Sequence, residues 1–137
     1  MGIVYADITL KNATDVGDSE RGHISKKEIR QVAVTAMVDT GAATLVINDK
    51  LRRQLGLRIR GKKQATLANE TKETVKLAGP VEVHWKNRDM VCRPWVISGN
   101  GEILLGAIPL EDMDLIVDPK RQELTGAHGD ENIGILK

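Results

Sequence analysis

The sequence predicts an all-β domain, mainly strands with two short helices. The chain has 137 residues, 41% of them hydrophobic, but only 2% are aromatic and Phe is absent. Its core must therefore consist of Val, Leu, Ile and Ala, and beta-branched side chains pack well on the pleated surface of a sheet. The apolar runs are short, and clusters of Gly, Pro, Asn and Asp that favour turns separate them.

The first third of the chain predicts two strands joined by a long connection. Residues 3–10 alternate in part between apolar and polar types, as an outer or interface strand would. Residues 11–27 are polar, include two glycines and predict a long loop or loose hairpin. Residues 28–38 contain an apolar run and predict a buried strand that ends at Asp39.

Both predicted helices have recognisable end signals. Asn48 can cap a helix over residues 49–55, and Gly56 stands where helices commonly end. Pro109 suits the first turn of a second, shorter helix that runs through Asp112. The other segments predict strands, which pair at residues 65–77, at 81–85 with 90–97, and at 115–117 with 123–125.

These elements fit one domain. A chain of this length can bury a self-standing core. We expect the domain to span residues 1–125 and residues 126–137 to form a loosely ordered C-terminal tail.

The charge, apolar content and cysteine count limit the partners and the compartment. A net charge of +1 argues against bulk attraction to nucleic acid or to a membrane surface. No apolar stretch is long enough for membrane insertion, and the first residues lack the pattern of a secretory signal. Cys92 is the single cysteine and cannot form an internal disulfide, so a reducing compartment is expected. We therefore expect a cytoplasmic protein.

Asp39 is the main candidate for chemistry. The segment Val38-Asp39-Thr40-Gly41-Ala42 places a carboxylate at the end of a core strand. An unpaired carboxylate is expensive to bury, so donors, a cation or another carboxyl group should meet it. Gly41 permits the sharp turn that such a meeting requires. The simpler interpretation is an Asp that only forms the turn after a strand.

Three segments resemble the retropepsin-like aspartic proteases, the single-domain relatives of pepsin. VDTGAATLVI resembles their catalytic strand and loop, and NDKLRRQLGL the short helix that follows in many cellular members. ILLGAIPLEDMDLIVDP resembles the second apolar-apolar-Gly element with its helix and closing strand. The resemblance spans most of residues 32–124. It implies a half-barrel fold with one Asp-Thr-Gly lobe per chain.

The resemblance implies an aspartic endopeptidase that hydrolyses protein or peptide substrates without cofactor or metal. Two Asp carboxylates activate a water in this family, but the chain has one Asp-Thr-Gly, and Leu105-Gly106-Ala107 lacks the second Asp. A homodimer would supply Asp39 from each subunit. By the family pattern, Asp39 is catalytic, Thr40 and Gly41 support the catalytic loop, and Gly41 and Ala42 offer backbone groups to the substrate.

The resemblance also assigns the walls of a cleft. Residues 67–75 fall where the family carries its flap, so Ala68, Asn69 and Glu70 are expected to contact substrate. This tip lacks the glycine-rich sequence of the retroviral enzymes. Ser98 and Gly99 belong to the loop that lines the side pockets and are also expected to bind substrate.

Three alternatives stay open. The chain could be a catalytically silent retropepsin-fold binding or dimerisation module. Cys92 near His84 suggests a thiol nucleophile, although packing between strands explains Cys92 better. Residues 50–63 hold seven basic residues and no acid, which would suit docking to an acidic partner or nucleic acid. Such a run is more often a solvated surface, and no nucleic-acid partner is expected.

Overall fold

The structure, a computed structural model, describes residues 2–134 and 136. Its helices are α1 (Ala13–Glu20), α2 (Asp49–Gln54) and α3 (Ala107–Asp112), with a 3-10 turn, η1 (Lys26–Glu28). Its strands are β1 (Val4–Asn12), β2 (Gln31–Val38), β3 (Leu45–Asn48), β4 (Ile59–Thr66), β5 (Lys72–Ala78), β6 (Val81–Trp85), β7 (Arg88–Cys92), β8 (Trp95–Ile97), β9 (Leu104–Leu105), β10 (Leu115–Asp118) and β11 (Glu123–Gly126). Among the described residues, no helix has the length and apolar character required to cross a membrane.

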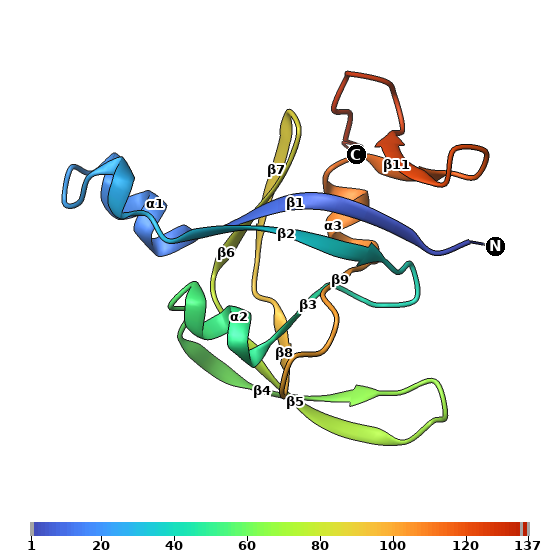
Figure 1. The fold of residues 1–137 in the computed structure, drawn as a ribbon, viewed down its shortest axis with the longest axis horizontal. Helices are drawn as coiled ribbons and strands as arrows, with labels where there is room; N and C mark the ends of the chain where they lie inside the picture. Colours follow the sequence, from blue (N-terminus) through green and yellow to red (C-terminus); the bar gives the residue numbers. More distant parts are fainter. Residues whose placement is uncertain (1, 135, 137) are drawn as a thin grey trace.

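The strands form one large curled sheet and one small sheet (Figure 1). Nine strands are ordered β4-β5-β8-β3-β9-β2-β1-β6-β7, and β10 pairs with β11. The large sheet encloses an aliphatic core with completely buried Leu10, Leu45, Ile47, Val83 and Leu105. The mainly β prediction is confirmed, although the described chain has three α-helices where the sequence predicted two.

β1 was predicted as an outer or interface strand, and it is internal to the sheet only over its second half. It pairs with β2 from Val4 to Lys11 but with β6 only from Thr9 to Asn12, so residues 4–8 have a strand on one side alone. Its alternating pattern arises because Val4, Ala6 and Ile8 face the core, while the residues between them are more accessible. The polar positions therefore mark a sheet face in contact with solvent.

β2 is buried on one face only, which corrects the prediction of a buried strand. Val32 and Val34 pack against the core, whereas Ala33 and Thr35 are exposed. The apolar run combines larger inward residues with small outward ones, and Ala does not reveal in a sequence which face it occupies.

The segment 11–27 contains the helix α1 over Ala13–Glu20, which corrects part of the predicted loop or loose hairpin. Asn12 caps α1, since its Oδ1 accepts from the backbone N–H of Asp15 at 3.0 Å. The side chain of Asn12 also donates to the carbonyl of Leu55. Asp15 accepts hydrogen bonds from the backbone and guanidinium of Arg30, and these bonds lower the pKa of Asp15. Contacts from distant parts of the chain thus hold a helix that has weak local signals.

One predicted hairpin is confirmed and the other is shorter than expected. β4 pairs with β5 in the predicted 65–77 region, and the pairing extends back to Ile59. β6 pairs with β7, but the predicted strand 90–97 is divided by Pro94, which lacks a backbone N–H. After the break, β8 leaves β7 and pairs with β3 and β5.

The remaining predicted elements are confirmed with small boundary shifts. Asn48 caps α2 by accepting from the backbone of Leu51 at 2.8 Å, and Gly56 follows with φ +64°. α3 contains Pro109 and ends at Asp112. β10 and β11 pair antiparallel as expected.

Arg88 connects three parts of the chain from a fully buried position. Its guanidinium donates to the carbonyls of Met113 and Asp114 at the end of α3, and to those of Gly129 and Glu131. Backbone carbonyls rather than a carboxylate thus bind the two terminal nitrogens, while the buried Nε atom has no hydrogen-bond partner in the described structure. The hydrogen bonds to Gly129 and Glu131 anchor residues 129–131 against β7.

Candidate active site

The loop between β2 and β3 presents Asp39. β9 lies between these two strands, parallel to β2 and antiparallel to β3. The backbone N–H of Asp39 donates to the carbonyl of Leu105 in β9 at 3.0 Å, and that of Ala42 closes the turn by donating to the carbonyl of Asp39 at 3.0 Å. The position of Asp39 is therefore fixed by strands from both halves of the chain.

The Asp39 carboxylate is held within its own loop. Its Oδ1 accepts a hydrogen bond from the backbone N–H of Gly41 at 2.9 Å. Asp39 is half-buried, and Thr40 and Gly41 are exposed. This carboxylate therefore meets one backbone donor while it stays accessible at the surface of a single chain. Such an arrangement leaves room for a second group to approach it.

Gly106 fits tightly under the Asp39 loop. A Cβ atom on Gly106 would lie 2.4 Å from the carbonyl oxygen of Thr44 and 2.5 Å from that of Ala42. The following residues bind the same loop, since the N–H groups of Ala107 and Ile108 donate to carbonyls of the loop at 2.8 and 3.0 Å. Sequence reasoning placed this segment near the site but did not identify the steric need for glycine.

An apolar concavity adjoins the catalytic-loop candidates on the side of Thr40. Thr40 contributes to its lining together with residues from α3 and β10, which include Ala107, Leu110, Leu115, Ile116 and Val117. Ile116 is 52% exposed and Ile108, in the first turn of α3, is 56% exposed. The neighbourhood of the Asp39 loop therefore carries apolar side chains that are accessible in the single chain.

The predicted flap residues form an ordered turn at the end of the β4–β5 hairpin. Asn69 accepts from the backbone and hydroxyl of Thr71 at 3.2 and 2.6 Å, and Glu70 takes a positive φ of 66°. Ala68, Asn69 and Glu70 are all exposed. The hairpin tip and the β2–β3 loop extend toward the same side of the molecule (Figure 1).

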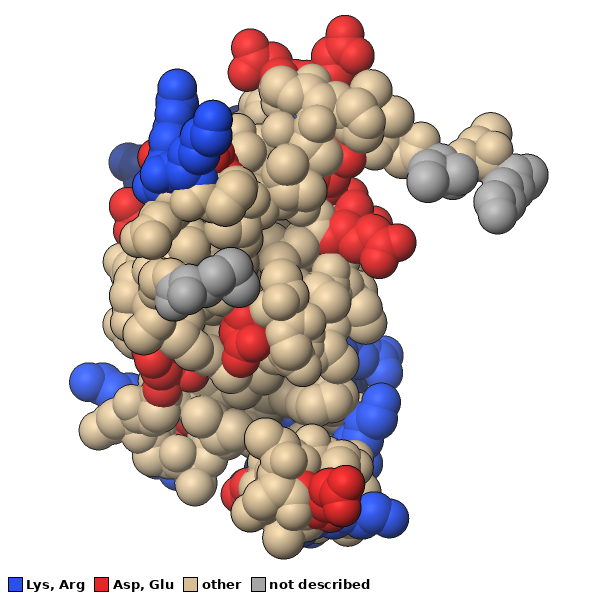
Figure 2. All heavy atoms as spheres, turned by 90° about the vertical axis from the view of Figure 1, so that its right-hand side faces the viewer, with Lys and Arg blue, Asp and Glu red and all other residues tan. Residues whose placement is uncertain are grey.

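Uncharged residues cover most of the side onto which these two segments open, and an acidic side chain lies near its centre (Figure 2). Figure 2 views this side, with Lys and Arg gathered toward its margins and a recess above the lowest lobe. The two views differ by a rotation about the vertical axis, so the lowest lobe of Figure 2 is the lowest part of Figure 1, which contains the hairpin tip. Neither the concavity beside Thr40 nor the cavity beside Gly99 is lined by Asp39 or by the hairpin tip.

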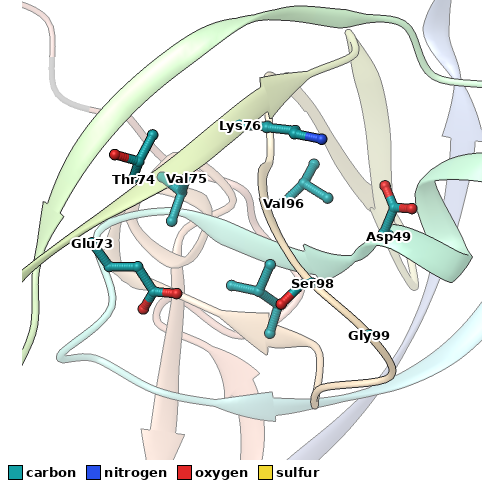
Figure 3. Close-up of a pocket in the computed structure, with 9 residues that line it drawn as sticks. Asp49, Glu73, Thr74, Val75, Lys76, Val96, Ser98 and Gly99 are labelled. Carbon is teal, nitrogen blue, oxygen red and sulfur yellow. The ribbon is translucent and has the colours of Figure 1, made fainter.

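Ser98 and Gly99 lie at a separate cavity of about 220 Å³ (Figure 3). It is bounded by β5, β8 and the start of α2, and its lining includes Asp49 and Lys76. The structure brings Ser98 and Gly99 together with Glu73, Thr74 and Val75 from the predicted flap segment. Asp49 and Lys76 also contribute to the lining but were not singled out, because nothing local in the sequence relates α2 and β5 to this loop.

Cys92 has the properties of a structural cysteine. Burial raises the pKa of its thiol to about 12, against a smaller opposing effect of a hydrogen bond with Thr44. A thiol with this pKa carries almost no thiolate at neutral pH, and the thiolate is the nucleophilic form. Burial of the Cys92 thiol therefore disfavours the alternative interpretation, in which Cys92 is a nucleophile.

The chain is similar to known proteins in sequence and in fold. The sequence matches a family model described as aspartyl protease over residues 26–107. A search of curated proteins found no match. The retroviral protease-like domain of Ddi1 from Leishmania major is similar in structure, with a TM-score of 0.57 and 17% identity, over 100% of this chain and 96% of that chain. This likeness shows a shared fold.

A second solved structure with similarity is a retropepsin-like aspartic protease from Rickettsia conorii. Its TM-score is 0.46 at 17% identity, over 86% of this chain and 89% of that chain.

Proposed function

Because the chain belongs to the aspartyl protease family, we propose that it is an aspartic endopeptidase that acts as a homodimer. The observation that carries the proposal is the geometry of the Asp-Thr-Gly loop. Asp39 follows β2 directly, its Oδ1 accepts from Gly41, and its carboxylate stays accessible in the single chain. A second copy of the chain would complete the pair of carboxylates.

The proposed chemistry uses one proton shared by two Asp39 side chains. Two carboxyl groups about 3 Å apart cannot both ionise, so one is charged and the other protonated. The charged group takes a proton from a bound water, and the water oxygen attacks the carbonyl carbon of the peptide bond. The protonated group donates to the carbonyl oxygen, and a proton then passes to the leaving amine.

The neighbouring residues take supporting roles in this proposal. Thr40 and Gly41 hold the loop, and the backbone groups of Gly41 and Ala42 bind the substrate. The turn at Asn69 covers the bound peptide and excludes water. Its ordered hydrogen bonds support a defined tip conformation in the absence of a glycine-rich sequence.

The exposed apolar residues near Thr40 support a twofold interface beside the Asp39 loops. Symmetry places identical residues against each other at the axis of a homodimer. We propose that the interface includes the two Asp39 loops, β10 and the N-terminal part of β1. Ile116 and Tyr5 are 52% and 49% exposed in the single chain, and their burial would favour association.

The competing function is a binding or dimerisation module that has the fold but no activity. A peptide-library cleavage assay separates the two, since the enzyme is expected to cleave and the module is not. A pepstatin-type mimic of the transition state should abolish the cleavage, because it requires the geometry of the two carboxylates. Cleavage that resists this mimic, or no cleavage of any peptide, would contradict the proposal.

We predict that activity depends on assembly. Specific activity per chain should fall when the protein is diluted below its dimer dissociation constant. Mixing wild type with a tenfold excess of Asp39→Asn should lower the activity per wild-type chain about tenfold, because most wild-type subunits then sit in mixed dimers. Sedimentation across the same concentrations should show the dimer. Constant activity in both experiments would mean that one chain holds a complete site.

We also predict a bell-shaped pH profile on the acidic side of neutrality. The rate should fall when both carboxyl groups of the pair are protonated and again when both are ionised. Because burial raises the pKa of Cys92 to about 12, the profile of Cys92→Ala should match that of wild type. A chelator should leave both profiles unchanged. A rate that keeps rising through alkaline pH and is lost in Cys92→Ala would identify a thiol mechanism.

A further inference from the structure

Two lysines line concavities beside Gly99, and a third lysine stands opposite one of them in the β4–β5 hairpin. Lys76 in β5 lines the cavity of about 220 Å³ together with Asp49 and Gly99 (Figure 3). Lys50 in α2 lines an adjoining concavity with the same two residues. Lys62 in β4 stands directly opposite Lys76 in the hairpin. We refer to Lys50, Lys62 and Lys76 as the lysine cluster.

Lys62 and Lys76 share the outer face of the β4–β5 hairpin. On this face, Gln64 donates a hydrogen bond to the hydroxyl of its cross-strand partner Thr74 at 3.0 Å. Side chains two positions along each strand point the same way, so both lysines lie on this face while Val75 is buried on the other. Like charges directly opposite each other destabilise a sheet. An anion bound here would remove that cost.

Asp49, the acidic residue that lines both concavities, is already paired. The carboxylate of Asp49 lies 2.8 Å from the Nε atoms of both Arg52 and Arg53. A hydrogen bond from Arg52 is the main reason that its pKa is lowered, with smaller effects from the charges of Arg52, Arg53 and Lys76. Within the residues that the structure describes, the lysine cluster makes no ion pair. Its positive charge is therefore free to attract a ligand.

We propose that the lysine cluster selects peptide substrates with acidic residues outside the segment that is cleaved. This inference rests on the proposed function and on the sequence-based expectation that Ser98 and Gly99 line a side pocket of the cleft. A peptide that leaves the cleft over this loop would pass Lys50 and Lys76, which line concavities beside Gly99. Glu73 also lines the cavity and would repel an acid placed there, so the preferred acids lie farther from the scissile bond.

An acidic peptide fits this surface better than a nucleic acid. Proteins that bind single strands stack bases on aromatic side chains. None of the aromatic residues of the chain lines either concavity in the described structure. The net charge of +1 also gives little long-range attraction for a polyanion. An extended peptide with a few carboxylates needs only the local charges.

Twofold symmetry would place one lysine cluster at each end of the cleft. A peptide has two chemically different ends, so its N-terminal and C-terminal flanks would each meet a copy of the same cluster. Acidic residues on either flank should therefore improve cleavage, and acids on both flanks should improve it further.

The test compares peptides that share one cleaved sequence and differ only in their flanks. Flanks with Glu, with Gln and with Lys are added to both ends, and kcat/KM is measured at about 50 mM and about 500 mM salt. We expect kcat/KM for the Glu peptide to exceed that for the Gln peptide about tenfold at low salt and less than about threefold at high salt. The Lys peptide should be the poorest substrate.

Two triple variants that remove the same amount of charge show whether the lysine cluster causes the preference for the Glu peptide. Lys50→Gln/Lys62→Gln/Lys76→Gln should reduce the Glu-to-Gln preference to less than about twofold. Lys26→Gln/Lys27→Gln/Lys120→Gln removes the same charge from exposed residues outside both concavities and should leave the preference unchanged.

A binding assay keeps this test separate from the proposed function. Fluorescence anisotropy with Asp39→Asn protein should show tighter binding of the Glu peptide than of the Gln peptide, and loss of the difference in the lysine-cluster variant. Absence of cleavage would overturn the proposed function without affecting this readout. Equal binding of the two peptides would overturn the inference. An oligonucleotide of equal charge that binds more tightly at the cluster would also overturn it.

Discussion

Asp39→Asn is expected to lower kcat for peptide hydrolysis at least about a thousandfold while the fold is retained. Asn preserves the shape of the side chain but removes the ionisable group on which the shared proton depends. Because two adjacent carboxylates repel each other, the melting temperature of the variant should equal or exceed that of wild type. Steady-state kinetics and thermal unfolding measure the two effects.

Asp89→Asn is the matched control for this substitution. Asp89 is exposed in β7, so its replacement should change neither kcat nor stability appreciably. Comparable turnover by Asp39→Asn and wild type would end the aspartic protease interpretation. A loss of activity accompanied by unfolding would instead indicate that Asp39 stabilises the loop.

The second large effect is expected for Gly106→Ala. The new methyl group would lie 2.4 Å from the carbonyl oxygen of Thr44, so the backbone of the Asp39 loop must move to accommodate it. Overpacking of this kind costs about 1–3 kcal/mol of unfolding free energy. A catalytic group displaced by about 1 Å can lose about a hundredfold in rate, so activity should fall more than stability alone explains.

Gly61→Ala tests whether the effect is specific to the loop. Gly61 lies in β4, and a Cβ atom there would meet no atom within 4 Å. This variant should stay within about 0.5 kcal/mol of wild type by chemical denaturation. If Gly106→Ala also kept the stability and the kcat of wild type, the tight contact between Gly106 and the Asp39 loop would be needed for neither property.

Local signals explain which elements could be predicted from the sequence. Asn48 and Gly56 specify the ends of α2 through a side-chain cap and a positive φ, and both effects act within a few residues. The Asp39 turn is equally local, since Gly41 supplies its hydrogen bond. These features were therefore visible before the fold was known.

Other elements depend on contacts that a linear pattern does not contain. α1 was missed because Arg30 and Leu55, which hold its start, are distant in the sequence. The sequence predicted one strand over 90–97, and neither the break at Pro94 nor the pairing of β8 with β3 and β5 was predicted. The meeting of Lys76 with Gly99 likewise requires the curvature of the sheet. The candidate loop was predictable, whereas its surroundings were not.

The insertion of β9 between β2 and β3 has a consequence for the order of folding. The hydrogen bonds that position Asp39 join the N-terminal third of the chain to residues near Leu105, which are made much later during synthesis. Closing such a long loop costs chain entropy before any contact compensates it, so these bonds form late. A nascent or truncated chain that lacks β9 therefore has Asp39 but no fixed loop. The Asp39 loop can take its fixed geometry only after the chain has been made through β9 and the first residues of α3.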